Sequence, residues 1–142
     1  MSELLTTARP YAKALFKSAK EKNMLEQYSG VLNNLNVVVN EPNIKKILLN
    51  DSFDNKYKAN VLSEILKDVL DENFSRFITL LTENNRLFVV SEIMDLYETY
   101  LQEEKSLKVA KIETAFELNN DQLESIKTAL ENKFKKKIEV EQ

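Results

Sequence analysis

Apolar residues recur every three or four positions through the first hundred residues, which is the spacing that places them on one face of an α-helix. Pro10 suits either a first helical turn or a bend in a helix that begins near Leu4. Several segments with this spacing follow one another, separated by short polar stretches. The pattern predicts helices that bury their apolar stripes against one another. The stripe of the first helix is Leu4, Ala8, Tyr11, Leu15 and Ala19.

Residues typical of helix ends mark the second and third helices. Asn23, followed three positions later by Glu26, suits the N-cap of the second helix. Gly30 inside that helix costs about 1 kcal/mol relative to alanine, which suggests close packing of a neighbour there. Pro42 suits the first position of a short third helix that ends at Leu49.

The next three helices are marked in the same way. Asp54 and Asp71 suit the N-caps of the fourth and fifth helices. Asn84-Asn85 is predicted to end the fifth helix, because asparagine tolerates the left-handed backbone conformation. The stripe of the sixth helix is Leu87, Val90, Met94, Tyr97 and Leu101.

The pattern changes after Lys105. From Leu107 to Phe116 polar and apolar residues roughly alternate, which predicts a strand. A seventh helix is predicted with Asn119 as its N-cap, and a second strand around Ile138 and Val140. Two strands and one helix bury little surface, so this unit looks incomplete. The predicted fold is mainly α, with a six-helix bundle over residues 1–105 and a small, incomplete α/β unit (strand-helix-strand) over residues 106–142.

The sequence lacks the residue types on which most catalytic mechanisms depend. The 142 residues include no histidine, no cysteine and a single glycine. Histidine and cysteine are the usual proton shuttle, nucleophile and metal ligands, and phosphate-binding loops need several glycines. We therefore expect no catalytic residue, no metal and no cofactor. No apolar run is long enough to cross a bilayer, and Met1 to Tyr11 shows no secretory signal, so a cytoplasmic protein is the default expectation.

Charge argues against a nucleic-acid partner. The net charge is −3, and residues 51–105 carry 12 acidic but only 6 basic side chains. Such a segment repels phosphates and attracts basic partners.

Three clusters of charged residues have ordinary structural explanations. Asp51 and Asp54 do not fit a calcium loop, because Phe53 occupies a ligand position and the glycine is missing. Glu103-Glu104 reads as solvated helix surface. The lysines near the C-terminus, which could touch phosphates, fit the end of a helix better. They are Lys133, Lys135, Lys136 and Lys137.

The first and fifth helices are more apolar than one contact requires. The first has an apolar stripe wider than half its circumference, and Leu80 widens the stripe of the fifth. Side by side, the two would leave a groove for an amphipathic helix of another chain. The alternative is that both are central helices of the bundle, and periodicity alone does not separate these interpretations.

Three segments resemble the delta subunit of F-type ATP synthases, whose mitochondrial relative is the oligomycin sensitivity-conferring protein. The first is Ala8–Phe16 (ARPYAKALF), and the second is Leu81–Leu87 (LTENNRL), where Asn85 replaces the glycine of many relatives. The third is Thr114–Leu118, followed by Gln122-Leu123. They occur in the family's order and cover nearly the whole chain.

The resemblance implies a non-catalytic connector in the peripheral stalk, on the cytoplasmic face of the bacterial inner membrane. In this family, helices 1 and 5 hold an N-terminal helix of an alpha subunit, and the C-terminal domain meets the b subunit. The assembly keeps the catalytic head still while the rotor turns. The residues expected near the alpha helix are Leu4, Ala8, Tyr11, Ala14, Leu15, Phe77, Leu80 and Leu81.

Two expectations qualify this interpretation. Family members usually continue through a glycine-containing hairpin and a final basic helix, whereas this chain stops at Gln142, so we expect weak binding to the b subunit or none. The alternative function is an RNA- or protein-binding helical adaptor unrelated to ATP synthase. An enzyme would have to work with Asp, Glu, Lys and Tyr alone.

Overall fold

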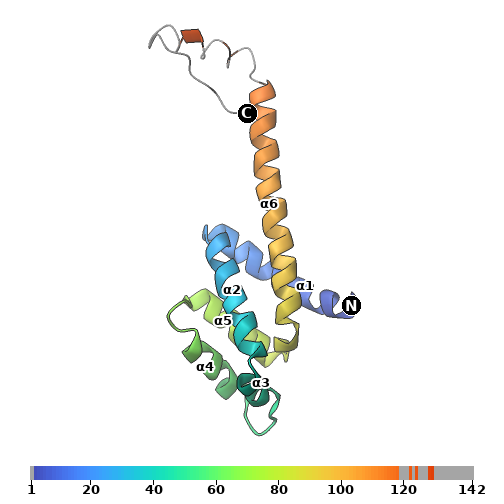
Figure 1. Ribbon diagram of the computed structural model, residues 1–142, viewed down its shortest axis with the longest axis vertical. Coiled ribbons are helices and arrows are strands. Elements are labelled where there is room, and N and C mark those ends of the chain that lie inside the picture. Colours follow the sequence, from blue (N-terminus) through green and yellow to red (C-terminus); the bar gives the residue numbers. More distant parts are fainter. Residues whose placement is uncertain (1, 119–121, 123, 125–127, 130–142) are drawn as a thin grey trace. The chain divides into compact units, whose positions relative to one another are not determined.

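The computed structural model describes residues 2–118, together with residues 122, 124, 128 and 129. Within these residues the chain forms helices and no strand, so the mainly α prediction is confirmed (Figure 1). The chain up to Leu101 forms one compact unit, and the chain from Gln102 onward belongs to a second. The helices are α1 (Ser2–Glu21), α2 (Leu25–Asn40), α3 (Pro42–Leu49), α4 (Asn55–Ile65), α5 (Glu72–Glu83), the 3₁₀-helix η1 (Leu87–Val89) and α6 (Val90–Leu118).

Three predicted helix starts are confirmed. The Asp54 side chain accepts a hydrogen bond from the backbone N–H of Tyr57 at 2.8 Å, and Asp71 accepts one from that of Phe74 at 2.7 Å. Each bond satisfies a donor that has no partner inside its helix. Pro42 begins α3, at a position where its missing N–H removes no helical hydrogen bond.

Asparagine ends two helices through the left-handed conformation. Asn85 has a φ of 55° and follows α5 as predicted. Asn23 was predicted to begin α2, but that prediction is wrong: its φ is 57°, and it ends α1 instead. The N–H of Met24 donates back to the carbonyl of Ala19 at 2.8 Å, which closes the loop typical of this helix end. After Asn85, the backbone N–H of Arg86 donates to the carbonyl of Leu81 at 2.8 Å and closes the same kind of loop.

The buried side of α1 is lined mostly by alanine. The helix begins at Ser2, so Pro10 lies inside it and not in its first turn. Small side chains let the backbone of α1 approach its neighbours closely, and they lose no rotamer freedom on burial. The buried residues of α1 are Ala8, Ala12, Leu15 and Ala19.

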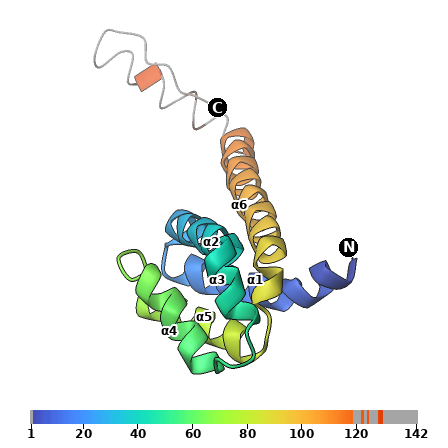
Figure 2. The same cartoon turned by 60° about the horizontal axis from the view of Figure 1, so that its bottom comes forward.

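Aromatic rings connect the helices of the first unit. Tyr28 of α2 meets Phe74 of α5 edge to face, with ring centroids 5.2 Å apart, and Phe74 meets Phe77 at 5.5 Å. Phe16 of α1 meets Tyr97 of α6 at 5.5 Å. Figures 1 and 2 accordingly show α1 crossing the first turns of α6, while α4 lies beside α5. These contacts fix the relative positions of the helices.

Gly30 offers a test of helix stability. The expected close neighbour is absent, because a Cβ at Gly30 would meet nothing within 4 Å, and the residue is exposed in the interior of α2. Gly30→Ala should therefore raise the free energy of unfolding by about 1 kcal/mol, since alanine restricts the unfolded chain and favours the helix. Urea unfolding measures the change. A variant less stable than the parent would show that this part of α2 is not a regular helix.

The strand predicted from Leu107 to Phe116 is wrong, because these residues continue α6. Six of these ten residues favour helices, namely two lysines, two alanines, one leucine and one glutamate. A helix satisfies its backbone hydrogen bonds internally, whereas a strand needs a neighbouring strand, and the described part of the chain provides none. The apolar members of the alternation are exposed here: Leu107, Val109 and Ile112.

Other predictions for the C-terminal part lie outside the described residues. They are the N-cap at Asn119, the strand around Ile138 and Val140, and the lysines from Lys133 to Lys137. The domain boundary between residues 105 and 106 stays a prediction. None of the described helices combines the length and apolar character required to cross a membrane.

Candidate partner-binding face of α1 and α5

Two side-chain hydrogen bonds hold α1 and α5 together. Near the start of α5, the Asn73 amide donates to the Ser18 hydroxyl at 2.7 Å. Just after its end, the Asn84 amide donates to the hydroxyl of Tyr11 at 3.1 Å. Ser18 follows Tyr11 along α1, whereas Asn84 follows Asn73 along α5, so the helices run in opposite directions. These two bonds, which we call the amide clamp, bracket the surface between the helices.

A polar cluster at the start of α5 extends the clamp to α2. The Tyr28 hydroxyl donates to Asp71 at 2.6 Å, and the Asn73 amide, 3.1 Å away, donates to the same hydroxyl. Because Asp71 also caps α5 through Phe74, one carboxylate joins two helices. The start of α5 is thereby fixed against both α1 and α2.

The cluster shifts two pKa values. Burial and the hydrogen bond to Asp71 raise the pKa of Tyr28 to about 12. Burial also raises the pKa of the Asp71 carboxyl, but the hydrogen bonds from Tyr28 and Phe74 and the charge of Lys22 outweigh it. The pKa of Asp71 therefore lies below its usual value, and the carboxylate is ionised at neutral pH.

The eight residues predicted for the alpha-subunit site separate into two groups. Four of them are buried in the unit's own core: Ala8, Leu15, Phe77 and Leu81. The other four are uncovered or half-covered: Leu4, Tyr11, Ala14 and Leu80. Leu4 and Leu80 keep 38% and 44% of their surface exposed, which is high for leucine. Each helix thus has a core side and an uncovered apolar side, and the partner groove stays a prediction.

Sequence reasoning missed the residues that hold the two helices together. Asn73, Asn84 and Ser18 form the amide clamp, but none was singled out as a contact between α1 and α5. Polar residues beside a helix end are ordinary, so their types carried no signal of a contact more than 50 positions away in sequence. The described residues contain no group of carboxylates able to hold a metal ion.

Comparison with known proteins identifies the family. The family model of the ATP synthase delta (OSCP) subunit matches residues 7–142. ATP synthase subunit delta of Nitrosomonas europaea is 33% identical over 141 residues, which cover 99% of this chain and 79% of that protein. The delta subunit of Marinobacter nauticus is 36% identical, with the same coverage of both chains. That of Stutzerimonas stutzeri is 36% identical over 96% of this chain and 77% of its own length.

These matches decide between the candidate functions. They exclude an adaptor unrelated to ATP synthase, and they agree with the absence of the usual catalytic residue types. They also bear out the resemblance seen in the three sequence segments. The chain belongs to the ATP synthase delta (OSCP) subunit family.

Proposed function

We propose that this chain is a non-catalytic stator connector of a bacterial ATP synthase and that it holds the N-terminal helix of an alpha subunit on α1 and α5. Family membership supports the stator role. The uncovered apolar side of these two helices supports the position of the alpha helix. The proposed partner surface consists of Leu4, Tyr11, Ala14 and Leu80, and we call it the α1–α5 face.

The spacing of these residues suits a helical partner. Leu4, Tyr11 and Ala14 are seven and three positions apart, so they share one side of α1. Leu80 belongs to α5, which the amide clamp holds beside α1. An amphipathic helix recognises such a surface with apolar residues at positions three, four and seven apart.

The rigidity of the face favours binding. The amide clamp and the contact between Tyr28 of α2 and Phe74 of α5 fix α5 before any partner arrives. A preformed surface loses little conformational freedom on binding, so more of the interaction energy appears as affinity. The same rigidity suits a connector that must keep the head from turning with the rotor.

The second attachment is proposed for the C-terminal part. In this arrangement residues 106–142 form the part of the chain that faces the b subunit. The chain would then lie at the cytoplasmic face of the inner membrane and be held there only by its partners.

The test is a matched pair of charge substitutions. Leu80→Asp should weaken binding of a fluorescently labelled alpha N-terminal peptide at least tenfold, because a buried leucine contributes about 1.5–3 kcal/mol. Val37→Asp is the control, since Val37 is 64% exposed on α2 and also lies three residues before its helix ends. Fluorescence anisotropy gives both dissociation constants.

The pair of variants separates the possible outcomes. Native circular dichroism in both, with affinity lost only in Leu80→Asp, supports the α1–α5 face. Equal affinity for Leu80→Asp and the parent chain would remove Leu80 from the site.

A further inference from the structure

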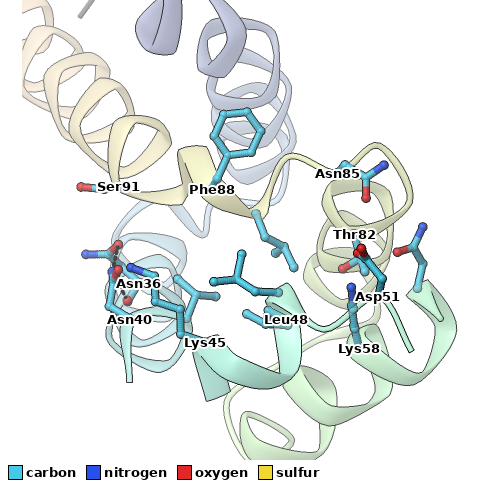
Figure 3. Close-up of a pocket in the computed structure, with 14 residues that line it drawn as sticks. Asn36, Asn40, Lys45, Leu48, Asp51, Lys58, Thr82, Asn85, Phe88 and Ser91 are labelled. Atoms are coloured by element: carbon cyan, nitrogen blue, oxygen red, sulfur yellow. Dashed lines mark hydrogen bonds between the residues drawn. The ribbon is translucent and has the colours of Figure 1, made fainter. Parts of the chain in front are cut away.

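A second concave site lies away from the α1–α5 face. A cavity of about 330 Å³ opens among the C-terminal end of α2, α3, the start of α4, the end of α5 and η1. Figure 3 shows Asn36 and Asn40 at one end of it and Asp51, Lys58 and Thr82 at the other. None of the residues of the α1–α5 face lines it. The volume suits a small molecule and exceeds the space that one protein side chain fills.

Lys58 is the unusual residue of this cavity. It is only 9% exposed, although lysine is almost never buried without a partner. Its ammonium makes no ion pair or hydrogen bond with any residue that the structure describes. In the described part of the chain, every buried side-chain nitrogen has a hydrogen-bond partner. Since the Lys58 ammonium has none, it is not fully buried and keeps some exposure to water. In Figure 3 the nitrogen of Lys58 points toward Asp51 and Thr82, at the wall of the cavity.

The rest of the lining combines a weak positive balance with apolar surface. Lys45 adds a second cation, and Asp51 is the one anionic residue of the lining. Leu48 and Phe88 supply apolar surface, and 64% of the surface of Phe88 is exposed. The lining therefore offers a cationic group on a largely buried side chain together with apolar surface.

Asparagine side chains shape the end of the cavity opposite Lys58. The Asn40 amide nitrogen donates to the backbone carbonyl of Asn36 at 2.8 Å and to its side-chain oxygen at 3.1 Å. These bonds fix the orientation of Asn40, so the polar wall is preformed. A preformed pocket with few fixed polar groups and apolar walls is the usual form of a small-molecule site.

We propose that this cavity binds a small organic anion whose acidic group pairs with Lys58 and whose aromatic or aliphatic body covers Leu48 and Phe88. The acid supplies the charge partner that the Lys58 ammonium lacks. The apolar body removes the ring of Phe88 from water. Carboxylates, sulfonates and phosphate monoesters all carry such an acidic group.

The probe is 1-anilinonaphthalene-8-sulfonate, an aromatic anion whose fluorescence rises in apolar surroundings. With the full 142-residue chain we expect saturable binding of one molecule. Lys58→Met keeps the length and bulk of the side chain but removes the charge, and should raise the dissociation constant about tenfold. Lys56→Met, an exposed site on the same helix, should leave it unchanged. The uncharged analogue N-phenyl-1-naphthylamine should bind the parent and Lys58→Met equally.

Two further variants keep the proposal testable if Lys58→Met fails to fold, as judged by urea unfolding. Phe88→Ser changes an exposed residue and should weaken binding of the same probe several-fold. Leu80→Ser alters the α1–α5 face and should have no effect, so failure of one site is distinguishable from failure of the other. Absence of saturable binding would overturn the proposal. Equal affinity in the parent and folded Lys58→Met, or in the parent and Phe88→Ser, would do the same.

Discussion

Phe74→Ala is expected to lower the free energy of unfolding by about 3–5 kcal/mol, which is the usual cost of emptying a buried aromatic site. Phe74 has no exposed surface, and its ring contacts Tyr28 of α2 and Phe77 of its own helix. Truncation removes both edge-to-face contacts and leaves a cavity where α2 meets α5. Urea unfolding followed by circular dichroism measures the loss.

Phe88→Ala provides the control for this prediction. The same atoms are removed, but Phe88 is 64% exposed, so the stability should change by less than about 0.5 kcal/mol. If Phe74→Ala costs no more than Phe88→Ala, the aromatic contact between α2 and α5 does not hold the unit together.

Asp71→Ala should cost about 2–3 kcal/mol near neutral pH. It removes the N-cap of α5, which is worth about 1 kcal/mol, and it leaves the buried hydroxyl of Tyr28 without its acceptor. Asp54→Ala is the matched control, because Asp54 also caps a helix but its side chain is exposed and binds no tyrosine. That control should cost only about 1 kcal/mol. Equal losses in the two variants would mean that the bond from Tyr28 contributes nothing.

The hydrogen-bonded residues Tyr28 and Asp71 make the free energy of unfolding depend on pH at both the acid and the alkaline extreme. The pKa of Asp71 is lower in the folded state, so its contribution is complete above the unfolded pKa of about 4 and is lost as pH falls through the folded value. The pKa of Tyr28 is raised to about 12, so its contribution is complete below the unfolded value of about 10 and is lost as pH rises through 12.

Asp71→Asn tests the acid side of this dependence. Asparagine keeps the shape and can still cap α5, but it carries no charge. The stability difference between Asp71→Asn and the parent should be constant from about pH 5 to 9 and shrink below about pH 4. A difference that stays constant down to pH 2 would show that the Asp71 carboxylate is not preferentially stabilised in the fold.

Helix positions were predictable because their signals are local. Asp54, Asp71 and Pro42 each act on residues within the next turn, so a short window of sequence contains the whole cause. The prediction that Asn23 begins α2 was wrong because asparagine suits more than one helix position. Asparagine favours both helix starts and left-handed helix ends, and the backbone between α1 and α2 decides which applies.

The division of α1 into core and partner residues was not predictable. Ala8 and Leu15 are buried, whereas Tyr11 is half-buried and Ala14 is exposed. Which side is covered depends on where α2, α5 and α6 lie, and that arrangement comes from contacts between residues far apart in sequence. The segment from Leu107 failed similarly, because alternation predicts a strand only where a second strand can pair with it.

The buried alanines of α1 set the distance between that helix and the rest of the unit. Ala8, Ala12 and Ala19 have no exposed surface, so a larger side chain at any of them would push α1 outward. Such a shift would carry Tyr11 away from Asn84 and stretch the bond that closes the amide clamp. The spacing of the partner surface is therefore determined by residues that no partner touches, and selection on docking would extend to the interior of the subunit.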